Sequence, residues 1–245
     1  MVPDNLDDAI DIELRMPPVV AARAVALATV VRRGLLEMLP EADPDEIDTA
    51  CFDLTSWAKV YLSDILEPPE MQFLRRPAGT LTKAEKEACL DAAEALAALG
   101  WCLTSRAEPL VSPHLVAPLP AVLSSSPGPW VNPSPFMERA HLRPESEIAT
   151  ERERAEIWWW RAGIDQDAAQ DAEVNSVIAE VAKESATATL IDEIDGDLSV
   201  DYQPFASIDR DRQATILVVS SNRLRALNWV CGFGPTWKDT PLDLN

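Results

Sequence analysis

Nine of the 20 prolines in this chain of 245 residues lie between residues 106 and 144. Proline lacks a backbone N–H and clashes with the preceding helical turn, so this segment excludes long helices and central strands. The segment still carries large apolar side chains such as Val122 and Trp130, whereas a disordered linker would be more polar. We therefore predict a proline-rich connector packed on the core, between a helical half at 1–105 and another at 145–245.

Helix start and stop signals flank this connector. In the first half, Asp43 precedes Pro44 as an N-cap residue precedes a proline in the first helical turn. Thr82 and Glu85 have the spacing of a capping box, and Gly100 stands where a left-handed residue would end that helix. These signals predict an all-α fold of about seven helices in a compact bundle. The two halves could be separate domains or parts of one single domain.

The second half carries the same helical pattern with one interruption. Apolar spacing predicts helices at 146–165, at 173–193 and at 207–232, the last one capped by Ser207. The stretch between the second and the third of these helices is predicted to be a turn and a loop.

Three adjacent tryptophans, Trp158, Trp159 and Trp160, lie within the first of these helices. Successive helical residues are rotated by about 100°, so the three indoles spread over roughly 200° and no single neighbour can cover them all. We interpret them mainly as core residues between two layers, because each buried indole removes a large apolar area from water. Trp158 is predicted to be the most exposed of the three and a candidate binding residue.

The charge balance restricts the partners of this protein. It has 41 acidic and 21 basic residues and a formal net charge of −20. Nucleic acids and anionic lipids both require a positive patch, so neither is an expected partner. No apolar run reaches the roughly 18 residues that span a membrane, and the acidic N-terminus does not resemble a secretory signal. We predict a cytoplasmic protein whose partner is another protein, with a basic protein as the specific form of this prediction.

The sequence does not show the motifs of common catalytic or cofactor sites. The four cysteines have no C-x-x-C spacing, and the two histidines, His114 and His141, both lie in the proline-rich segment. Phosphate-binding glycine loops and the G-x-S-x-G motif are absent. The acidic segment after Asp192 lacks the glycine and glutamate positions of an EF-hand. We therefore predict no catalytic residues, no cofactor and no metal site.

The last predicted helix contains the most distinctive polar residues. Arg223 lies on its apolar stripe, where an arginine either pairs with a carboxylate as a structural tie or binds an anion. Asn228 and Trp229 follow near the helix end, before two glycines and Trp237. We predict that the aromatic residues close the C-terminus as a lock, and we select Arg223, Asn228 and Trp229 as candidate binding residues.

The same segment carries a family resemblance. The pattern R-x-x-A-L-N-W, then G, then W-x-D-T resembles the C-terminal signature of the bacterial domain-of-unknown-function family 4272. The matching positions are Arg223, Ala226, Leu227, Asn228, Trp229, Gly232, Trp237, Asp239 and Thr240. Members usually have glutamate, arginine and histidine where this chain has Asn222, Arg223 and Leu224, so a shared catalytic Glu or His is not expected here. The resemblance implies an all-helical bacterial protein and no mechanism, since the family has no established activity.

Three functional hypotheses remain open. The first is a non-enzymatic acidic helical protein that acts by binding another protein, for example an immunity or antitoxin-like protein that neutralises a basic partner. The second is an enzyme or a small-anion-binding protein with a pocket between the two halves around Arg223. The third is a structural subunit of a larger assembly. The sequence leaves the oligomeric state open.

Overall fold

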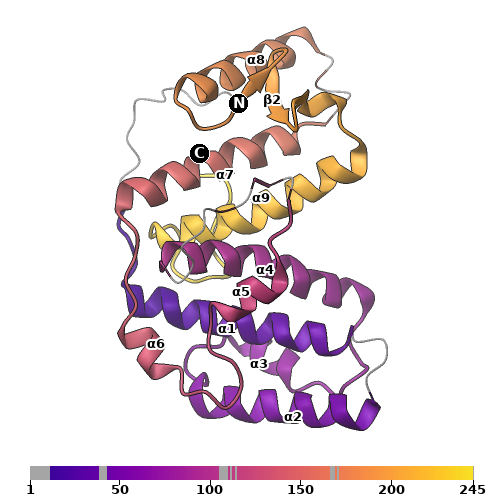
Figure 1. Cartoon of the computed structure of the whole chain (residues 1–245), viewed down its shortest axis with the longest axis vertical. Helices are drawn as coiled ribbons and strands as arrows, with labels where there is room; N and C mark the ends of the chain where they lie inside the picture. The colour runs from indigo at the N-terminus through magenta and orange to yellow at the C-terminus, as the bar shows by residue number, and fades with distance from the viewer. Residues whose placement is uncertain are drawn as a thin grey trace. The chain divides into compact units, whose positions relative to one another are not determined.

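The structure is a computed structural model that is mostly helical (Figure 1). It describes residues 12–38, 43–104, 110, 112–113, 115–165, 169 and 171–244. Over these residues it has nine α-helices, which confirms the predicted all-α class, and a small antiparallel sheet of three strands that the sequence analysis did not predict. None of the helices in the described residues is long and apolar enough to cross a membrane.

The chain divides into two units that are described separately below. The N-terminal unit consists of Leu14–Val111 and Ala117–Arg143. The C-terminal unit consists of Met1–Glu13, Ser112–Val116 and Pro144–Asn245. Both units thus take residues from the proline-rich segment.

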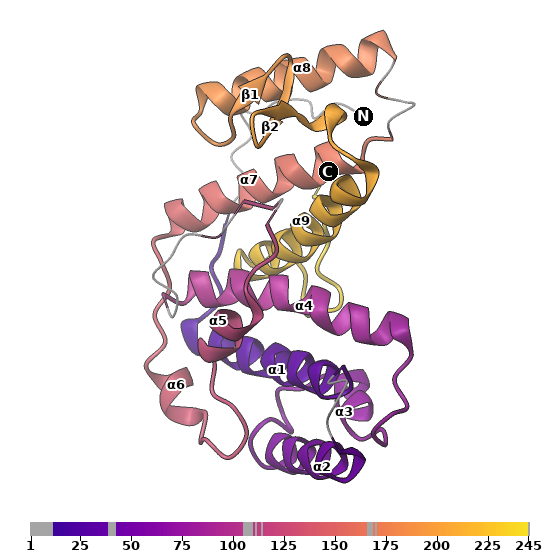
Figure 2. The same ribbon diagram turned by 45° about the vertical axis from the view of Figure 1, so that its right-hand side comes forward.

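The N-terminal unit is built around its first helix. Figure 1 and Figure 2 both show α1 between α4 on one side and α2 and α3 on the other. Its helices are α1 (Pro17–Leu36), α2 (Pro44–Tyr61), α3 (Pro68–Leu74), α4 (Lys83–Cys102), α5 (Leu119–Ser124) and α6 (Ser134–Glu138). The core between α1, α2 and α3 consists of Val25, Ala26, Leu54, Trp57, Ala58, Leu62, Leu66 and Leu74. The two short helices α5 and α6 come from the proline-rich segment, as expected for a stretch that cannot form long helices.

Local capping sets where α2 and α4 begin. The Asp43 side chain accepts a hydrogen bond from the Asp45 N–H at 2.9 Å, and Thr82 and Glu85 form the predicted capping box. The prediction for Gly100 was wrong, because α4 continues past it to Cys102. The left-handed residue is instead Thr104, with φ +56°. Trp101 and Cys102 are buried, and their packing favours two more helical residues over an earlier stop.

The C-terminal unit has two layers. Its elements are α7 (Glu145–Gly163), α8 (Ala172–Thr187), β1 (Glu193–Ile194), β2 (Asp197–Val200), β3 (Gln203–Pro204), a short 3-10 helix (Phe205–Ser207) and α9 (Arg210–Val230). Helix α7 packs along α9, and the sheet packs on α8 (Figure 2). The core between these layers consists of Trp158, Ala182, Ile191, Leu198, Val200, Phe205, Ile208 and Ile216.

The sheet replaces a segment that was predicted as helix end and loop. Strands β1, β2 and β3 pair antiparallel in chain order. Asp195 and Gly196 connect the first pair with φ +50° and +79°, and Asp201 and Tyr202 connect the second pair with φ +49° and +63°. Two consecutive positive φ values are typical of the type I′ turn that suits a two-residue hairpin. The predicted Ser207 cap of α9 was also wrong, because the cap is Asp209, which accepts a hydrogen bond from the Arg212 N–H at 2.8 Å.

Candidate functional site

Asn228 lies at the contact between α7 and α9, and it is fully buried. Its Oδ1 accepts a hydrogen bond from Arg152 Nε at 2.8 Å, and its Nδ2 donates to the Pro241 carbonyl oxygen at 2.9 Å. Arg152 also pairs with Glu156 at 3.0 Å. One amide therefore links α7, α9 and the C-terminal segment. All of these contacts are internal, which makes Asn228 a structural tie in this arrangement.

Arg223 is also buried, with 3% of its surface exposed. Its Nη2 donates to the Leu115 carbonyl oxygen at 3.3 Å. The carboxylate of Glu151, which pairs with Arg154, lies within the electrostatic reach of Arg223. Burial raises the pKa of Glu151, and the charges of Arg154 and Arg223 oppose that rise. The pairs Glu151–Arg154 and Arg152–Glu156 have the spacing of surface helix pairs, but Glu151 and Arg152 are largely enclosed.

Trp229 and Trp237 form the predicted aromatic lock. Their ring centroids are 5.6 Å apart in an edge-to-face arrangement, and Trp229 is 5% exposed. Two glycines lie between these tryptophans in the sequence. Gly232 has φ +89° and Gly234 has φ +82°, and these left-handed conformations let the chain turn back. A Cβ atom at Gly232 would lie 2.6 Å from the Glu13 carbonyl oxygen. Position 232 therefore requires glycine for two reasons, the positive φ and the lack of space for a side chain. The lock is confirmed, and the indole of Trp229 serves packing.

The prediction for Trp158 was wrong. It is the buried member of the three tryptophans, at 3% exposure, whereas Trp159 and Trp160 are partly exposed. Its ring lies 6.4 Å from that of Phe205, which follows directly after β3. The sheet that covers Trp158 was predicted as a loop, so its covering layer was missing from the sequence argument.

Sequence reasoning also missed a buried ion pair in the same unit. Arg161, in the last turn of α7, donates from Nε and Nη2 to the two carboxylate oxygens of Asp197, both at 2.7 Å. Asp197 also accepts hydrogen bonds from the N–H groups of Leu198 and Ala206. The guanidinium lies 4.5 Å from the centre of the Phe205 ring. The pair is saturated by the protein itself, and it holds the sheet on α7.

The nucleophiles and metal ligands of the described residues form no assembled catalytic set. All four cysteines are free and buried, as is usual for cysteines that serve as small apolar residues. Burial raises the pKa of Cys89 and of Cys231 to about 11, so both thiols are protonated at neutral pH. His141 is exposed, and His114 lies outside the described residues. No group of three or more His, Cys, Asp or Glu residues within the described ranges could hold a metal ion.

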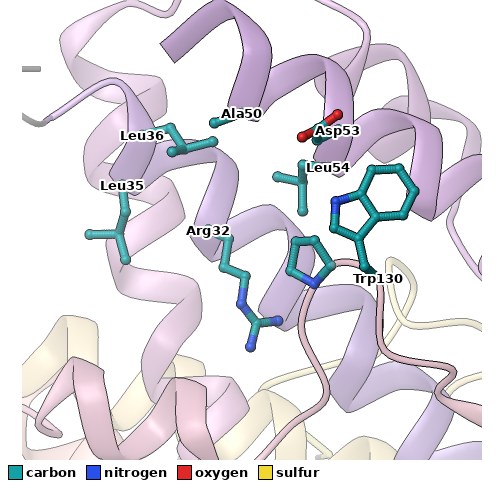
Figure 3. Close-up of a pocket in the computed structure, with 8 residues that line it drawn as sticks. Arg32, Leu35, Leu36, Ala50, Asp53, Leu54 and Trp130 are labelled. Atoms are coloured by element: carbon teal, nitrogen blue, oxygen red, sulfur yellow. The ribbon is translucent and has the colours of Figure 1, made fainter. Parts of the chain in front are cut away.

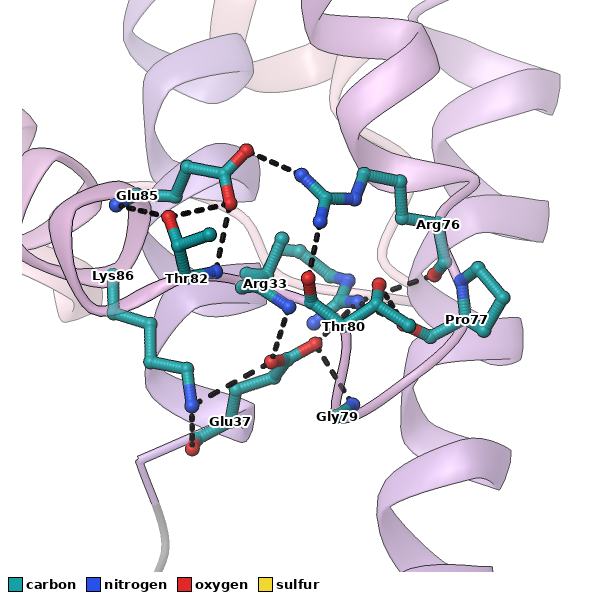
Figure 4. A network of polar contacts seen from close by, with 10 residues as sticks. Arg33, Glu37, Arg76, Pro77, Gly79, Thr80, Thr82, Glu85 and Lys86 are labelled. Atoms are coloured by element: carbon teal, nitrogen blue, oxygen red, sulfur yellow. Dashed lines mark hydrogen bonds and ion pairs between the residues drawn. The ribbon is translucent and has the colours of Figure 1, made fainter.

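The N-terminal unit contains an enclosed carboxylate that the sequence did not single out. The side chain of Glu37 is 1% exposed and pairs with Arg33 at 2.7 Å and with Lys86 at 3.7 Å (Figure 4). Its two oxygens also accept hydrogen bonds from the N–H groups of Gly79 and Leu81, both at 3.1 Å. Burial alone would raise the pKa of Glu37, but these hydrogen bonds and charges together lower it.

Arg33 completes this network from α1. Its side chain is fully enclosed, and its Nη2 donates to the carbonyl oxygens of Arg76 and Pro77 at 3.2 and 3.3 Å. In the described part of the chain, its Nε and Nη1 groups have no hydrogen-bond partner. Arg33 and Glu37 therefore fix the loop between α3 and α4 onto α1. The network is a structural tie, because the carboxylate of Glu37 is enclosed and both of its oxygens accept hydrogen bonds from the protein itself.

A cavity of about 340 Å³ lies elsewhere in the N-terminal unit, and none of the predicted site residues belongs to its lining (Figure 3). It is formed by α1, α2 and the loop between α5 and α6. The residues around it are Arg32, Leu35, Leu36, Ala50, Asp53, Leu54, Pro129 and Trp130. Six of these eight are apolar, and the size falls in the range of about 300–1,000 Å³ that is usual for ligand pockets.

Trp130 is the most exposed of the residues that line this cavity, at 61%. The proline-rich connector was predicted to pack its apolar residues on the core. That prediction is right for Val122, which is fully buried, and wrong for Trp130 and for Val116, which is 62% exposed. An exposed tryptophan at the rim of an apolar cavity is the arrangement most typical of binding surfaces.

The comparisons with known proteins give a family and no function. The family model described as "Domain of unknown function (DUF4272)" matches residues 5–184. The chain belongs to the DUF4272 family. No curated protein and no solved structure matches it. The matched residues of this DUF4272 protein include the cavity and most of α8, but the C-terminal segment at 223–240, which carried the resemblance, lies beyond them.

Sequence reasoning found two buried polar residues of this DUF4272 protein, Arg223 and Asn228, and missed its cavity. Arg223 and Asn228 were recognisable because a polar residue on an apolar helical stripe stands out. The cavity has no such signal, since its apolar lining resembles any core. The order Gly128–Pro129–Trp130 was the available clue, because turns of this kind usually place glycine after proline.

Proposed function

We propose that this DUF4272 protein is a non-enzymatic, cytoplasmic, acidic protein that acts by binding a protein with a basic surface. Five arginines are buried among the described residues, against the buried carboxylates of Glu94 and Asp197 and the enclosed side chain of Glu37. The buried arginines are Arg23, Arg33, Arg152, Arg161 and Arg223. The exterior is therefore more acidic than the formal net charge of −20 suggests, and this single observation carries the proposal.

The burial and the internal contacts of the arginines support a binding role over catalysis. Arg33, Arg152 and Arg161 bond to side chains and carbonyl oxygens of their own unit, so their charges stabilise the fold and offer little to an outside anion. An acidic exterior attracts basic proteins over long distances and accelerates their association. An immunity or antitoxin-like neutraliser of a basic partner is the specific form of the proposal that fits these features.

Affinity purification tests this proposal. The tagged protein is purified from its native lysate at moderate salt, and we expect a stoichiometric partner of high isoelectric point that dissociates when the salt concentration is raised. The salt step matters because contacts between exposed charges are screened within a Debye length of about 10 Å at 0.1 M. Recovery of no basic stoichiometric partner would remove the proposal. A partner whose binding resists salt would contradict its electrostatic basis.

Anion binding around Arg223 remains the second candidate, favoured by the raised pKa of Glu151 near two arginines. A carboxyl group with a raised pKa is a common feature of catalytic sites. The hydrogen bond from the Arg223 guanidinium to the Leu115 carbonyl oxygen is equally typical of a structural arginine. The proposal of a protein partner has the wider support, because it uses the charge of the whole exterior.

A further inference from the structure

We infer that the cavity beside Trp130 is the docking point of the basic partner, and that it takes a large apolar side chain flanked by lysines or arginines. This inference rests on the proposed function and adds to it the place and the chemistry of the contact. The partner segment is thus amphipathic, with one apolar anchor and a basic surround.

The cavity has the size and lining for an apolar anchor. Its volume of about 340 Å³ exceeds what a single leucine side chain needs, and it opens to solvent at the rim that Trp130 forms (Figure 3). Leu54 is 1% exposed and belongs to the core of the unit, so the cavity reaches down to firmly packed residues. Hot spots of protein interfaces have this form: a central apolar pocket with an aromatic residue beside it.

The backbone at Trp130 is held in a conformation that tryptophan rarely adopts. The Val131 N–H donates to the Gly128 carbonyl oxygen at 3.2 Å, which closes a turn with Pro129 and Trp130 at its centre. Trp130 has φ +67°. Proline followed by a residue of positive φ defines a type II turn, whose third position favours glycine. Here the glycine precedes the proline, and a large aromatic residue occupies the strained position.

Neither packing nor secondary structure accounts for this tryptophan. The other non-glycine residues with positive φ lie in places where a left-handed residue is common: Thr104 and Thr189 directly after helix ends, and Asp195, Asp201 and the exposed Tyr202 in hairpin turns. Trp130 combines a strained backbone with 61% exposure, so burial does not offset the strain. Strain retained at an exposed aromatic residue points to a function that needs the side chain in place.

The loop that carries Trp130 is fixed before any partner arrives. Arg32 donates to the carbonyl oxygens of Leu123, Ser126 and Pro127 at 2.9, 3.0 and 2.9 Å. The indole of Trp57, fully buried in the core, donates to the Val131 carbonyl oxygen at 2.9 Å. The loop is thus attached on both sides of Trp130. A preorganised aromatic residue loses little conformational entropy on binding, which favours affinity.

Charge around the cavity selects a basic segment. Asp53 lies at the rim on the same side as the indole, whereas the guanidinium of Arg32 is turned away toward the loop carbonyl groups (Figure 3). The N-terminal half of α2, which leads to Asp53, exposes only acidic charges: Asp45, Glu46 and Asp48, with Asp43 as its cap. A membrane surface does not fit, because anionic lipids would be repelled.

The experiment measures binding of a fluorescein-labelled amphipathic peptide made of leucine and lysine, by fluorescence anisotropy at low salt. Trp130→Gly is expected to weaken binding about tenfold or more, as loss of a central aromatic anchor does. Glycine accepts the left-handed backbone, so this variant is expected to keep the fold, which circular dichroism checks. Asp53→Lys is expected to weaken binding about fivefold more than Glu180→Lys, its charge-matched control.

Two matched control variants make the same chemical changes elsewhere in the chain, so they show whether the effects depend on the position at the cavity. Tyr202→Gly also removes an exposed aromatic residue at a positive φ, and Glu180→Lys makes the same change of net charge at an exposed position of α8. If the peptide binds but Trp130→Gly and Asp53→Lys behave like these controls, the inference is overturned and the proposed function stands. A peptide of leucine and glutamate that binds as well as the basic one also overturns it. If no basic peptide binds the wild type and no basic partner co-purifies, both proposals fail.

Discussion

Gly34 shows how one missing side chain determines the contact between two helices. It lies on the face of α1 that packs on α4, and a Cβ atom at this position would come within 2.3 Å of the Cβ atom of Cys89. No real pair of such atoms approaches so closely, so a side chain at Gly34 would push α1 and α4 apart. The sequence gives no hint of this requirement, because an isolated glycine in a helix usually only weakens it.

Replacement of Gly34 by alanine is therefore expected to destabilise the protein by roughly 1–3 kcal/mol, the usual effect of overpacking a core. Gly163 is the matched control, because it is also helical and a Cβ atom there meets nothing within 4 Å. Gly163→Ala is expected to stabilise by about 0.5–1 kcal/mol, since alanine has the higher helix propensity. Urea unfolding measures both changes. Equal effects of the two substitutions would show that the close helix contact has no energetic weight.

At the scale of elements, the loop between α3 and α4 is attached to α1 by the carboxylate of Glu37, in addition to hydrogen bonds within the loop such as that from Thr80 to the Pro77 carbonyl oxygen. Gly79 and Leu81 of this loop donate to that carboxylate, and Arg33 and Lys86 balance its charge. A buried ion pair gains little over an apolar pair, but removal of one partner leaves the other charge unbalanced. The consequence is a strong dependence of the element arrangement on one side chain.

Glu37→Gln is expected to lower the free energy of unfolding at neutral pH by roughly 3–5 kcal/mol, as breaking a buried pair does. The pKa of Glu37 in the folded state is lower than its ordinary value of 4.5. Its contribution is thus fully present above that value and is lost as the pH falls through the folded-state pKa. We therefore expect the difference between wild type and variant to shrink below about pH 4.5, a window measured by urea unfolding in a pH series.

Glu87 provides the control for this experiment. It pairs with Lys83 on the exposed side of α4, with 56% of its side chain exposed. Exposed pairs contribute only about 0–1 kcal/mol, so Glu87→Gln is expected to change the unfolding free energy little at any pH. A difference between Glu37→Gln and wild type that stays constant from neutral to acidic pH would contradict the lowered pKa of Glu37.

For the whole molecule, stability and the attraction of partners depend more on where the charges lie than on the net charge. The chain carries a net charge of −20, and its buried charged groups are mainly arginines. Like charges on the exterior repel each other and oppose the folded state, which holds them closer together than the unfolded chain does. The exposed negative charge that attracts a basic partner therefore lowers the stability of the isolated protein.

Salt is accordingly expected to stabilise this protein. Raising sodium chloride from about 20 to about 300 mM should increase Tm by a few degrees, because it screens the repulsion between exposed carboxylates. Differential scanning fluorimetry measures the shift. Glu180→Lys, which removes one exposed negative charge and adds a positive one, should raise Tm at low salt more than at high salt. A fall of Tm with salt would mean that attractive surface pairs outweigh the repulsion.

Features that depend on residues close together in the chain were predictable without the tertiary structure. The Asp43 cap, the capping box at Thr82 and the lock of Trp229 and Trp237 were all predictable. Each follows from groups a few positions apart along the chain, whose hydrogen bonds or turns form locally.

Tertiary structure alone decided which side chains are buried and which remain exposed. Trp158 is buried because a sheet from another part of the chain covers it, whereas Trp130 is exposed in a loop whose backbone Arg32 and the buried Trp57 fix by hydrogen bonds. Gly100 failed as a helix end because packing of the following residues outweighed its local preference. Burial depends on contacts between distant segments, and a single sequence does not encode those contacts in any local pattern.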